Sequence, residues 1–138
     1  MDGILLIDKP SSMTSHDVVN FLRKKFQMRK IGHSGTLDPM ATGLLIILLG
    51  KATKLSRSFA ELDKEYEATL TLGESTDTQD AQGKTVFKSD IKSLDENRIR
   101  EVFLRFKGEI EQVPPMVSAI RYRGKRLYEL ARKNQVVP

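Results

Sequence analysis

The stretch GHSGTLDPMATGLL, residues Gly32–Leu45, decides how the front of this chain folds. Its three glycines and its Asp-Pro pair favour a bent, exposed backbone over a helix interior. The apolar run Leu44–Leu49 that follows predicts a buried strand. The carboxylate of Asp38 is therefore expected on a stiff loop at the edge of a core, where catalytic groups tend to lie. Because Pro39 also restricts Asp38 to extended or turn conformations, the residue fits an ordinary turn equally well.

Outward from this stretch, the pattern of apolar residues predicts a mixture of helices and strands. Thr14 and Asp17 have capping-box spacing, and Thr14 or Ser15 is expected to cap a helix that runs to about Phe26. Residues 65–72 alternate polar and apolar side chains, which predicts a strand with one wet face. The other expected elements are strands at Ile4–Ile7 and Thr85–Lys88, helices over Lys51–Leu62 and from a Ser93 capping box through Phe106, a polar loop at Glu74–Gly83, a hairpin pairing Ser118–Tyr122 with Lys125–Leu127, and a helical turn at Tyr128–Lys133.

Composition and charge describe a globular chain with two basic ends. The 138 residues suffice for one domain, and the chain has no cysteine, which excludes disulfides and thiolate metal sites. No segment approaches a membrane span and no signal peptide is visible, so we expect a cytoplasmic protein. Lys and Arg outnumber Asp and Glu nine to four in residues 1–60 and six to one in 114–138, whereas residues 61–113 carry eight against thirteen. The basic ends suit a polyanion, and they suit solvated helix faces equally well.

Five ordered blocks of the sequence resemble the TruB-type pseudouridine synthases, which convert uridine-55 of tRNA to pseudouridine. Gly32–Leu45 is similar to the family's catalytic motif. The other four blocks are Gly3–Ser15 (GILLIDKPSSMTS), Lys64-Glu65-Tyr66, Leu72–Gly83 (LGESTDTQDAQG) and Val113–Arg132 (VPPMVSAIRYRGKRLYELAR). The resemblance implies an α+β pseudouridine-synthase fold, a mixed and mostly antiparallel sheet flanked by helices, present here only in part.

The same resemblance implies roles for three residues. Asp38 takes the position of the catalytic aspartate, which acts as nucleophile or base on a uridine flipped out of its stack. His33 takes the position of a histidine that contacts the RNA, and Tyr66 that of the tyrosine that stacks on the uracil near its C5 proton. From the residues alone, His33 could equally bond its own loop backbone and Tyr66 could belong to a core. Because the reaction needs no redox step or group donor, neither a cofactor nor a metal is expected.

Two further residues have a predicted supporting role. Lys9, after the first strand, either supports the catalytic loop or lies along the surface with its ammonium in water. Asp80 lies in Thr76–Gly83, a segment that lacks the spacing of a calcium loop, and is expected to order that loop rather than to react. The clusters Arg23-Lys24-Lys25, Arg29-Lys30 and Arg121–Arg126 are candidate contacts for RNA phosphates.

One family block has no counterpart in these residues. It is a Gly-Thr-Tyr-Ile-Arg-like strand whose arginine pairs with the catalytic aspartate. The resemblance therefore implies that residues 1–138 form the N-terminal part of a catalytic domain, without its C-terminal part and the RNA-binding domain. The expected partners are the T-arm of tRNA and a separate chain that carries the missing half; activity of these residues alone is left open. The alternatives are a relative of the guide-RNA-dependent synthases, a non-catalytic RNA-binding fragment and, more distantly, a carboxylate glycosidase.

Overall fold

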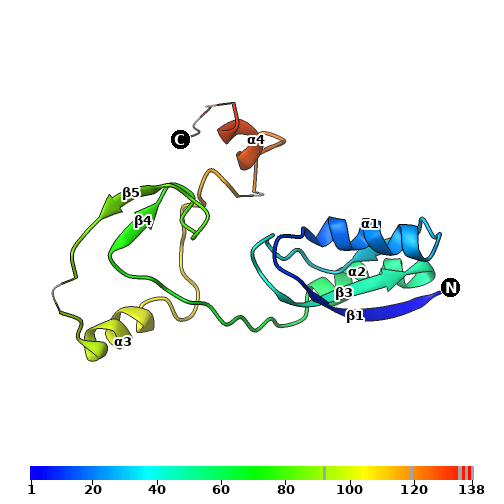
Figure 1. Ribbon diagram of the computed structural model, residues 1–138, viewed down its shortest axis with the longest axis horizontal. Coiled ribbons are helices and arrows are strands. Elements are labelled where there is room, and N and C mark those ends of the chain that lie inside the picture. The colour runs from blue at the N-terminus through cyan, green and yellow to red at the C-terminus, as the bar shows by residue number, and fades with distance from the viewer. Residues whose placement is uncertain (92, 119, 134, 136, 138) are drawn as a thin grey trace. The chain divides into compact units, whose positions relative to one another are not determined.

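The computed structural model describes all residues of 1–138 except Lys92, Ala119, Asn134, Val136 and Pro138. The chain forms two compact units, Met1–Glu67 and Ala68–Pro138, which we call the first and second units. Figure 1 labels the helices and strands of both. Within the described residues, no helix is both long enough and apolar enough to cross a membrane.

A three-stranded antiparallel sheet forms the centre of the first unit. Its strands are β1 (Gly3–Lys9), β3 (Gly43–Leu49) and β2 (Ile31–His33), in the order β1-β3-β2. Because β3 pairs with a neighbour on both sides, most of it is buried, with Leu45, Ile47, Leu48 and Leu49 no more than 3% exposed. The predicted buried strand is confirmed. The strand β2 was not predicted, since three residues that include a glycine show no alternation.

Helix α1 (Ser15–Lys25) covers one face of this sheet (Figure 1). Thr14 is its N-cap: the Thr14 hydroxyl oxygen accepts the backbone N–H of Asp17 at 3.0 Å, and the Asp17 carboxylate accepts that of Thr14 at 2.9 Å. The predicted capping box is therefore confirmed, and Ser15 is left free for another contact. The core between helix and sheet consists of Val18, Val19, Leu22, Ile31, Leu45, Ile47 and Leu49.

The segment after β3 forms two short helices rather than the single helix predicted over Lys51–Leu62. These are the 3₁₀ helix η1 (Gly50–Leu55) and α2 (Ser56–Ala60). Gly50 has a φ of +55°, and a Cβ on it would meet Asp2 Oδ1 at 1.9 Å and Met1 O at 2.6 Å. Only glycine, which has no Cβ, fits this close approach, and its positive φ lets the chain turn sharply after β3.

The second unit contains short elements, some of which differ from the prediction. They are β4 (Glu74–Thr76), β5 (Thr85–Lys88), α3 (Glu96–Leu104), β6 (Arg121–Tyr122), β7 (Lys125–Arg126) and α4 (Leu127–Ala131). The segment Glu74–Thr76, predicted as loop, pairs with the predicted strand Thr85–Lys88. Asp95 rather than Ser93 caps α3, because its carboxylate accepts the N–H of Asn97 at 2.9 Å. The hairpin is confirmed through β6 and β7, while Ala119 of its predicted first strand lies outside the described residues.

The strand predicted over residues 65–72 does not form. Residues 63–71 have no regular secondary structure, and Tyr66, Leu70 and Leu72 are 69%, 63% and 39% exposed. Alternation predicts which side chains share a face, but a strand also needs a neighbour to accept its backbone hydrogen bonds. Among the described residues, no such neighbour pairs with this segment.

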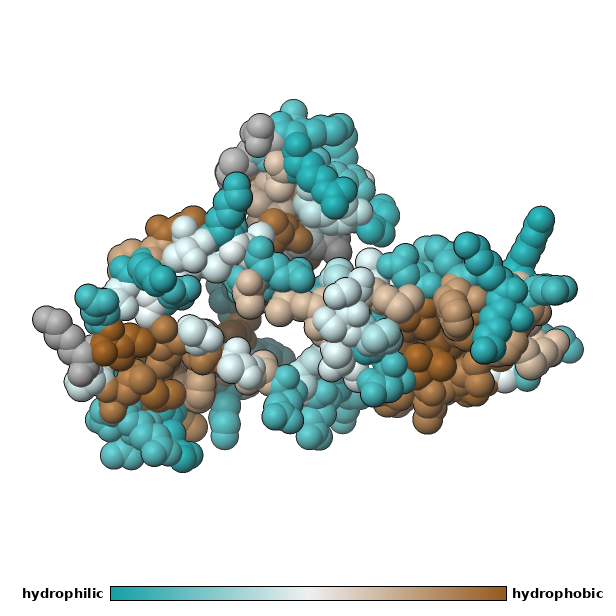
Figure 2. Space-filling model, viewed as in Figure 1, coloured by the Kyte–Doolittle hydropathy of each residue, from teal (hydrophilic) through white to brown (hydrophobic). Residues whose placement is uncertain are grey.

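The sheet of the first unit has a second, largely apolar face. Ile4, Leu6 and Leu44, which alternate with the core residues along β1 and β3, are 44%, 68% and 63% exposed. Figure 2 shows apolar surface gathered over this unit. The predicted α+β class, with antiparallel sheets and flanking helices, is confirmed.

Candidate functional site

The candidate catalytic residue Asp38 lies in the loop of residues 34–42, which joins β2 to β3. The loop turns directly after it, since the N–H of Ala41 donates to the Asp38 carbonyl at 3.1 Å. The Asp38 side chain is exposed, and no salt bridge among the described residues involves it. The predicted position on a loop at the edge of the core is therefore confirmed.

Lys9 fixes the loop on the C-terminal side of Asp38. It is 0% exposed, which excludes the surface position that the sequence left open. Its ammonium group donates to three backbone carbonyls: those of Pro10 at 2.9 Å, Met13 at 2.6 Å and Pro39 at 3.3 Å. A buried charge is tolerated when hydrogen bonds replace its water, and these carbonyls replace it here. The lysine thereby ties the end of β1 to the residue that follows Asp38.

Ser15 fixes the loop on the N-terminal side of Asp38. Its side chain is 2% exposed, and its hydroxyl oxygen accepts the N–H of Leu37 at 2.9 Å. The same hydroxyl lies 3.3 Å from the Leu37 carbonyl, to which it donates. Because buried side chains hold the residues on both sides of Asp38, the backbone that carries its exposed carboxylate is fixed in position.

Other backbone contacts complete the support of the loop. The N–H of Ser12, a residue with a φ of +70°, donates to the Pro39 carbonyl at 2.7 Å. The N–H of Gly43 donates to the Asp8 carboxylate at 3.1 Å, where the loop enters β3. These contacts join residues 8–12 to the Asp38 loop, so the ends of two separate sequence blocks form one assembly.

His33 ends β2 on the same hairpin as Asp38. It pairs with Ile47 of β3, and its carbonyl accepts the hydroxyl of Ser56 at 3.4 Å. Its Nδ1 is buried and has no hydrogen-bond partner among the described residues. The sequence alternative, a histidine that bonds its own loop backbone through this nitrogen, is therefore not seen.

Tyr66 is not brought to the Asp38 loop by any contact among the described residues. It lies in the irregular segment 63–71 and is 69% exposed. The alternative that Tyr66 belongs to a core is wrong, because its side chain is largely in solvent. The proposed stacking of Tyr66 on a uracil stays a prediction.

The loop between β4 and β5 is ordered by its own side chains. The Asp80 carboxylate accepts the hydroxyl of Thr78 at 2.7 Å and the N–H of Gln82 at 2.9 Å. These bonds, the hydroxyl first, lower the pKa of Asp80 below its usual value. At Gly83, a Cβ would meet Thr78 Oγ1 at 2.1 Å, so the loop closes tightly. Asp80 thus orders this loop, as predicted.

The C-terminal basic segment combines arginines with tyrosine rings. The guanidinium of Arg123 lies 5.3 Å from the centre of the Tyr122 ring, and those of Arg126 and Arg132 lie 5.8 and 5.3 Å from that of Tyr128. Cations placed over half-buried rings at the surface suit contact with both phosphates and bases. Among the described residues, no group of three His, Cys, Asp or Glu could hold a metal ion.

Sequence reasoning missed Ser15 as part of the site. It was considered only as an alternative helix cap, yet its partner Leu37 lies 22 positions along the chain. The available signal was that Thr14 and Ser15 cannot both be the N-cap. With Asp17 matched to Thr14, the second hydroxyl needed another partner in a helix that packs on the core.

The site is thus an exposed aspartate on a hairpin loop that buried side chains hold in place, within a mixed helix-and-sheet fold. Known proteins are similar to this chain in sequence and in structure. The family model for the N terminal domain of the TruB family pseudouridylate synthases matches residues 23–138. The chain belongs to this family.

Its relatives include proteins named tRNA pseudouridine synthase B. That of Opitutus terrae is 53% identical over 133 residues, which are 96% of this chain and 55% of the relative. That of Caldanaerobacter subterraneus subsp. tengcongensis is 47% identical over 137 residues, which are 99% of this chain and 48% of the relative. The chain therefore spans about half the length of the curated relatives it matches.

Two similar solved structures support the fold. A Cbf5-Nop10-Gar1 complex contains a chain that is 30% identical, with a TM-score of 0.57 over 88% of this chain and 31% of the other. An H/ACA RNP bound to a substrate RNA containing 2′-deoxyuridine contains one that is 28% identical, with a TM-score of 0.54 over 81% and 30%.

Proposed function

We propose that these residues supply the catalytic aspartate and part of the RNA-binding surface of a tRNA pseudouridine-55 synthase. The observation that carries the proposal is the loop in which Ser15 and Lys9 hold the residues on either side of the exposed Asp38. A free carboxylate on a fixed backbone is what a nucleophile or base needs before its substrate arrives. Family membership and the names of the relatives support the choice of reaction.

The proposed reaction cleaves the bond between C1′ and N1 of a flipped uridine, turns the uracil and rejoins it through C5. The C5 proton leaves and N1 gains a proton, so the isomerisation is balanced without a redox partner. Asp38 acts as nucleophile or base at this centre, and Tyr66 stacks on the detached base. His33, which ends β2 directly before the Asp38 loop, contacts the RNA in this proposal.

The proposed substrate is the T-arm of tRNA rather than an RNA defined by a guide. The chain is 53% identical to a relative named tRNA pseudouridine synthase B, against 30% to the matching chain of the Cbf5-Nop10-Gar1 complex. A guide-RNA-dependent reaction is the second candidate, favoured by the shared fold of that complex. It predicts that a bare T-arm is converted only after a guide RNA is added.

The test is release of the C5 hydrogen from a T-arm hairpin made with tritium at C5 of its uridines. We expect the chain alone to convert little RNA, and conversion to rise when the C-terminal segment of the Opitutus terrae relative is added in trans. The matched control is Asp38→Asn in the same mixture, which keeps the side-chain size and removes the reactive oxygen. Equal release with Asp38 and with Asn would refute the proposal, whereas RNA binding without release in every mixture would favour a non-catalytic RNA-binding fragment.

A further inference from the structure

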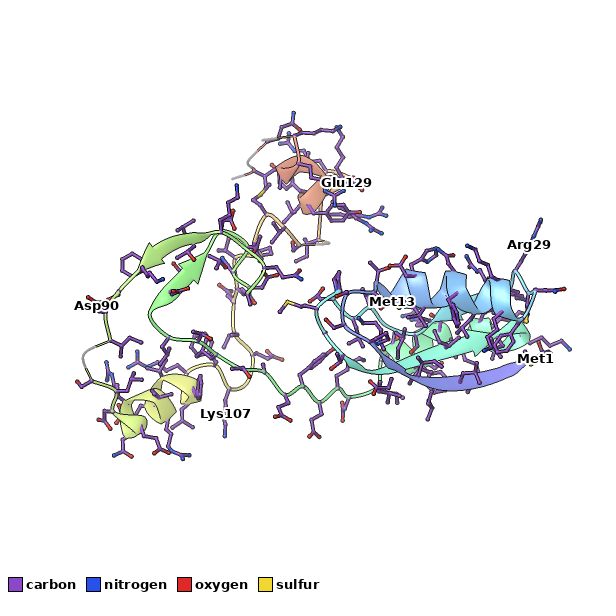
Figure 3. The ribbon with its side chains drawn as sticks, viewed as in Figure 1. Met1, Met13, Arg29, Asp90, Lys107 and Glu129 are labelled. Carbon is purple, nitrogen blue, oxygen red and sulfur yellow. The ribbon has the colours of Figure 1, made fainter. Side chains whose placement is uncertain are left out.

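Positive charge in the first unit gathers at the end of α1 that lies away from the Asp38 loop. We call the group the distal cluster; its members are Arg23, Lys24, Lys25, Arg29, Lys30 and Lys51. Met13, whose carbonyl bonds Lys9 beside the loop, and Arg29 are labelled near opposite ends of the helix in Figure 3. The eleven residues of α1 span about 16 Å.

The end of the unit that holds Asp38 offers no comparable attraction for a polyanion. Asp8 pairs with Leu44 near the end of β1, Asp17 lies in the first turn of α1, and Asp38 lies in the loop. Lys9 at this end is buried and bound to carbonyls, and Arg57, which follows the Ser56 that contacts His33, is paired with Glu61. The concentrated positive charge of this unit therefore lies at the other end of α1.

The distal cluster is held in place by the backbone. At the end of α1, the N–H of Met28 donates to the Arg23 carbonyl at 3.0 Å, and Gln27 has a φ of +50°, which together form the turn that presents Arg29. The N–H of Gly50 donates to the Lys30 carbonyl at 2.8 Å, which brings the next residue, Lys51, beside the cluster.

Arg23 is the most strongly fixed member. Its Nη2 donates to the Ile31 carbonyl at 2.8 Å, and its Nε is buried without a partner among the described residues. Together with Lys24 and Arg29, and with Gln27 and Met28, it lines a shallow, open depression of the surface.

The cluster carries more charge than helix stability requires. Cations in the last turn offset a negative end equivalent to about half a charge, and Asp2 adds one carboxylate, which accepts the N–H of Lys51 at 2.6 Å. About four positive charges remain, and no member forms a salt bridge among the described residues. Arg29, Lys30 and Lys51 also lie beyond the helix, so its dipole does not explain them.

We propose that the distal cluster binds the phosphate backbone of an RNA stem whose loop presents its uridine to Asp38. The proposal rests on the function proposed above and adds a second contact, one helix length away. An A-form RNA stem rises by less than the ~3.4 Å per base pair of B-DNA, so the 16 Å of α1 corresponds to at least about five base pairs. The contact is therefore independent of base sequence and requires a stem of that length.

The test compares hairpins with the same T-loop and stems of three or eight base pairs, bound to the full chain carrying Asp38→Asn. We expect the longer stem to bind more tightly, with a steeper dependence of log affinity on log salt. In the double variant Lys24→Gln/Arg29→Gln, the slope for the long stem should fall by about 1.4 to 1.8, because about 0.7 to 0.9 is lost per phosphate contact. The control pair Lys54→Gln and Arg57→Gln removes the same charge from η1 and α2 and should change the slope by less than about 0.5.

The outcomes separate this proposal from the proposed reaction. An unchanged salt slope in the distal pair (Lys24→Gln/Arg29→Gln), or an equal fall in the control pair (Lys54→Gln/Arg57→Gln), would overturn the distal site. Either result would do so even if the chain with Asp38 intact releases tritium. The expected difference would support the site even if no tritium is released. Loss of binding to anionic lipid vesicles in the distal pair, with RNA binding intact, would overturn the assignment to RNA.

Discussion

Replacing Lys9 by methionine should destabilise the first unit while leaving its surface unchanged. The change keeps a long apolar stem but removes the donor that serves the carbonyls of Pro10, Met13 and Pro39, at 2.9, 2.6 and 3.3 Å. A buried acceptor without a donor costs about 1 to 3 kcal/mol, and removing the desolvated ammonium recovers part of this cost. With two short bonds and one long one, we expect a net loss of about 2 to 3 kcal/mol, or roughly 30- to 150-fold in the folding equilibrium.

The assay is a urea titration followed by the methyl NMR signals of Val18 and Val19, which belong to the core of this unit. If the free energy of unfolding falls by about 1 kcal/mol per molar urea, the unfolding midpoint should fall by roughly 2 to 3 M. The control is Lys24→Met, the same substitution at an exposed position of α1. Midpoints for Lys9→Met and Lys24→Met that agree within the error of the titration would refute the view that the buried ammonium holds the loop.

Further predictions concern the reaction, the loop and pH. Asp38→Asn should abolish tritium release while T-arm binding, measured by fluorescence anisotropy, persists. Tyr66→Phe should already slow release by about 100-fold if the hydroxyl helps to remove the C5 proton, whereas near-normal release, lost only in Tyr66→Leu, would limit Tyr66 to stacking. Ser15→Ala should speed amide exchange at Leu37 by about fivefold, the equivalent of a hydrogen bond worth about 1 kcal/mol, and unchanged exchange would contradict the clamp. The hydroxyl and N–H of the N-cap threonine lower the pKa of Asp17, so its stabilisation of α1 is present above its ordinary pKa of 3.8 and is lost as pH falls through the lowered value; circular dichroism of Asp17→Asn should lack this acid-side loss.

The elements whose signals lie in a few consecutive residues could be predicted from the sequence. The Thr14–Asp17 capping box and the apolar run of β3 are readable because each is written in a few consecutive residues. The strand β2 was missed because Ile31–His33 is defined only by its pairing with β3. The strand expected over residues 65–72 does not form for the opposite reason. Its alternation of polar and apolar residues is clear, but no described strand pairs with it.

The same distinction applies to the candidate site. The position of Asp38 on a loop before a buried strand followed from glycine and proline placement alone. The role of Ser15 did not, and that of Lys9 stayed one of two alternatives, because their partners Leu37 and Pro39 lie 22 and 30 positions along the chain. A buried lysine bound only to carbonyls also has no sequence signature of its own, as no acidic partner marks it.

The placement of Lys9 at the end of β1 has a consequence for how the unit folds. Closing the β2–β3 hairpin spans only residues 34–42, whereas docking β1 on β3 closes residues 10–42. The longer closure costs about 1 kcal/mol more chain entropy, so the hairpin is expected to form before β1 joins it. The Asp38 loop would then exist early but stay unclamped until β1 arrives with Lys9. Order in this loop thus reports that the last strand of the sheet has docked, and a refolding experiment that follows the Pro39 region would time that final step.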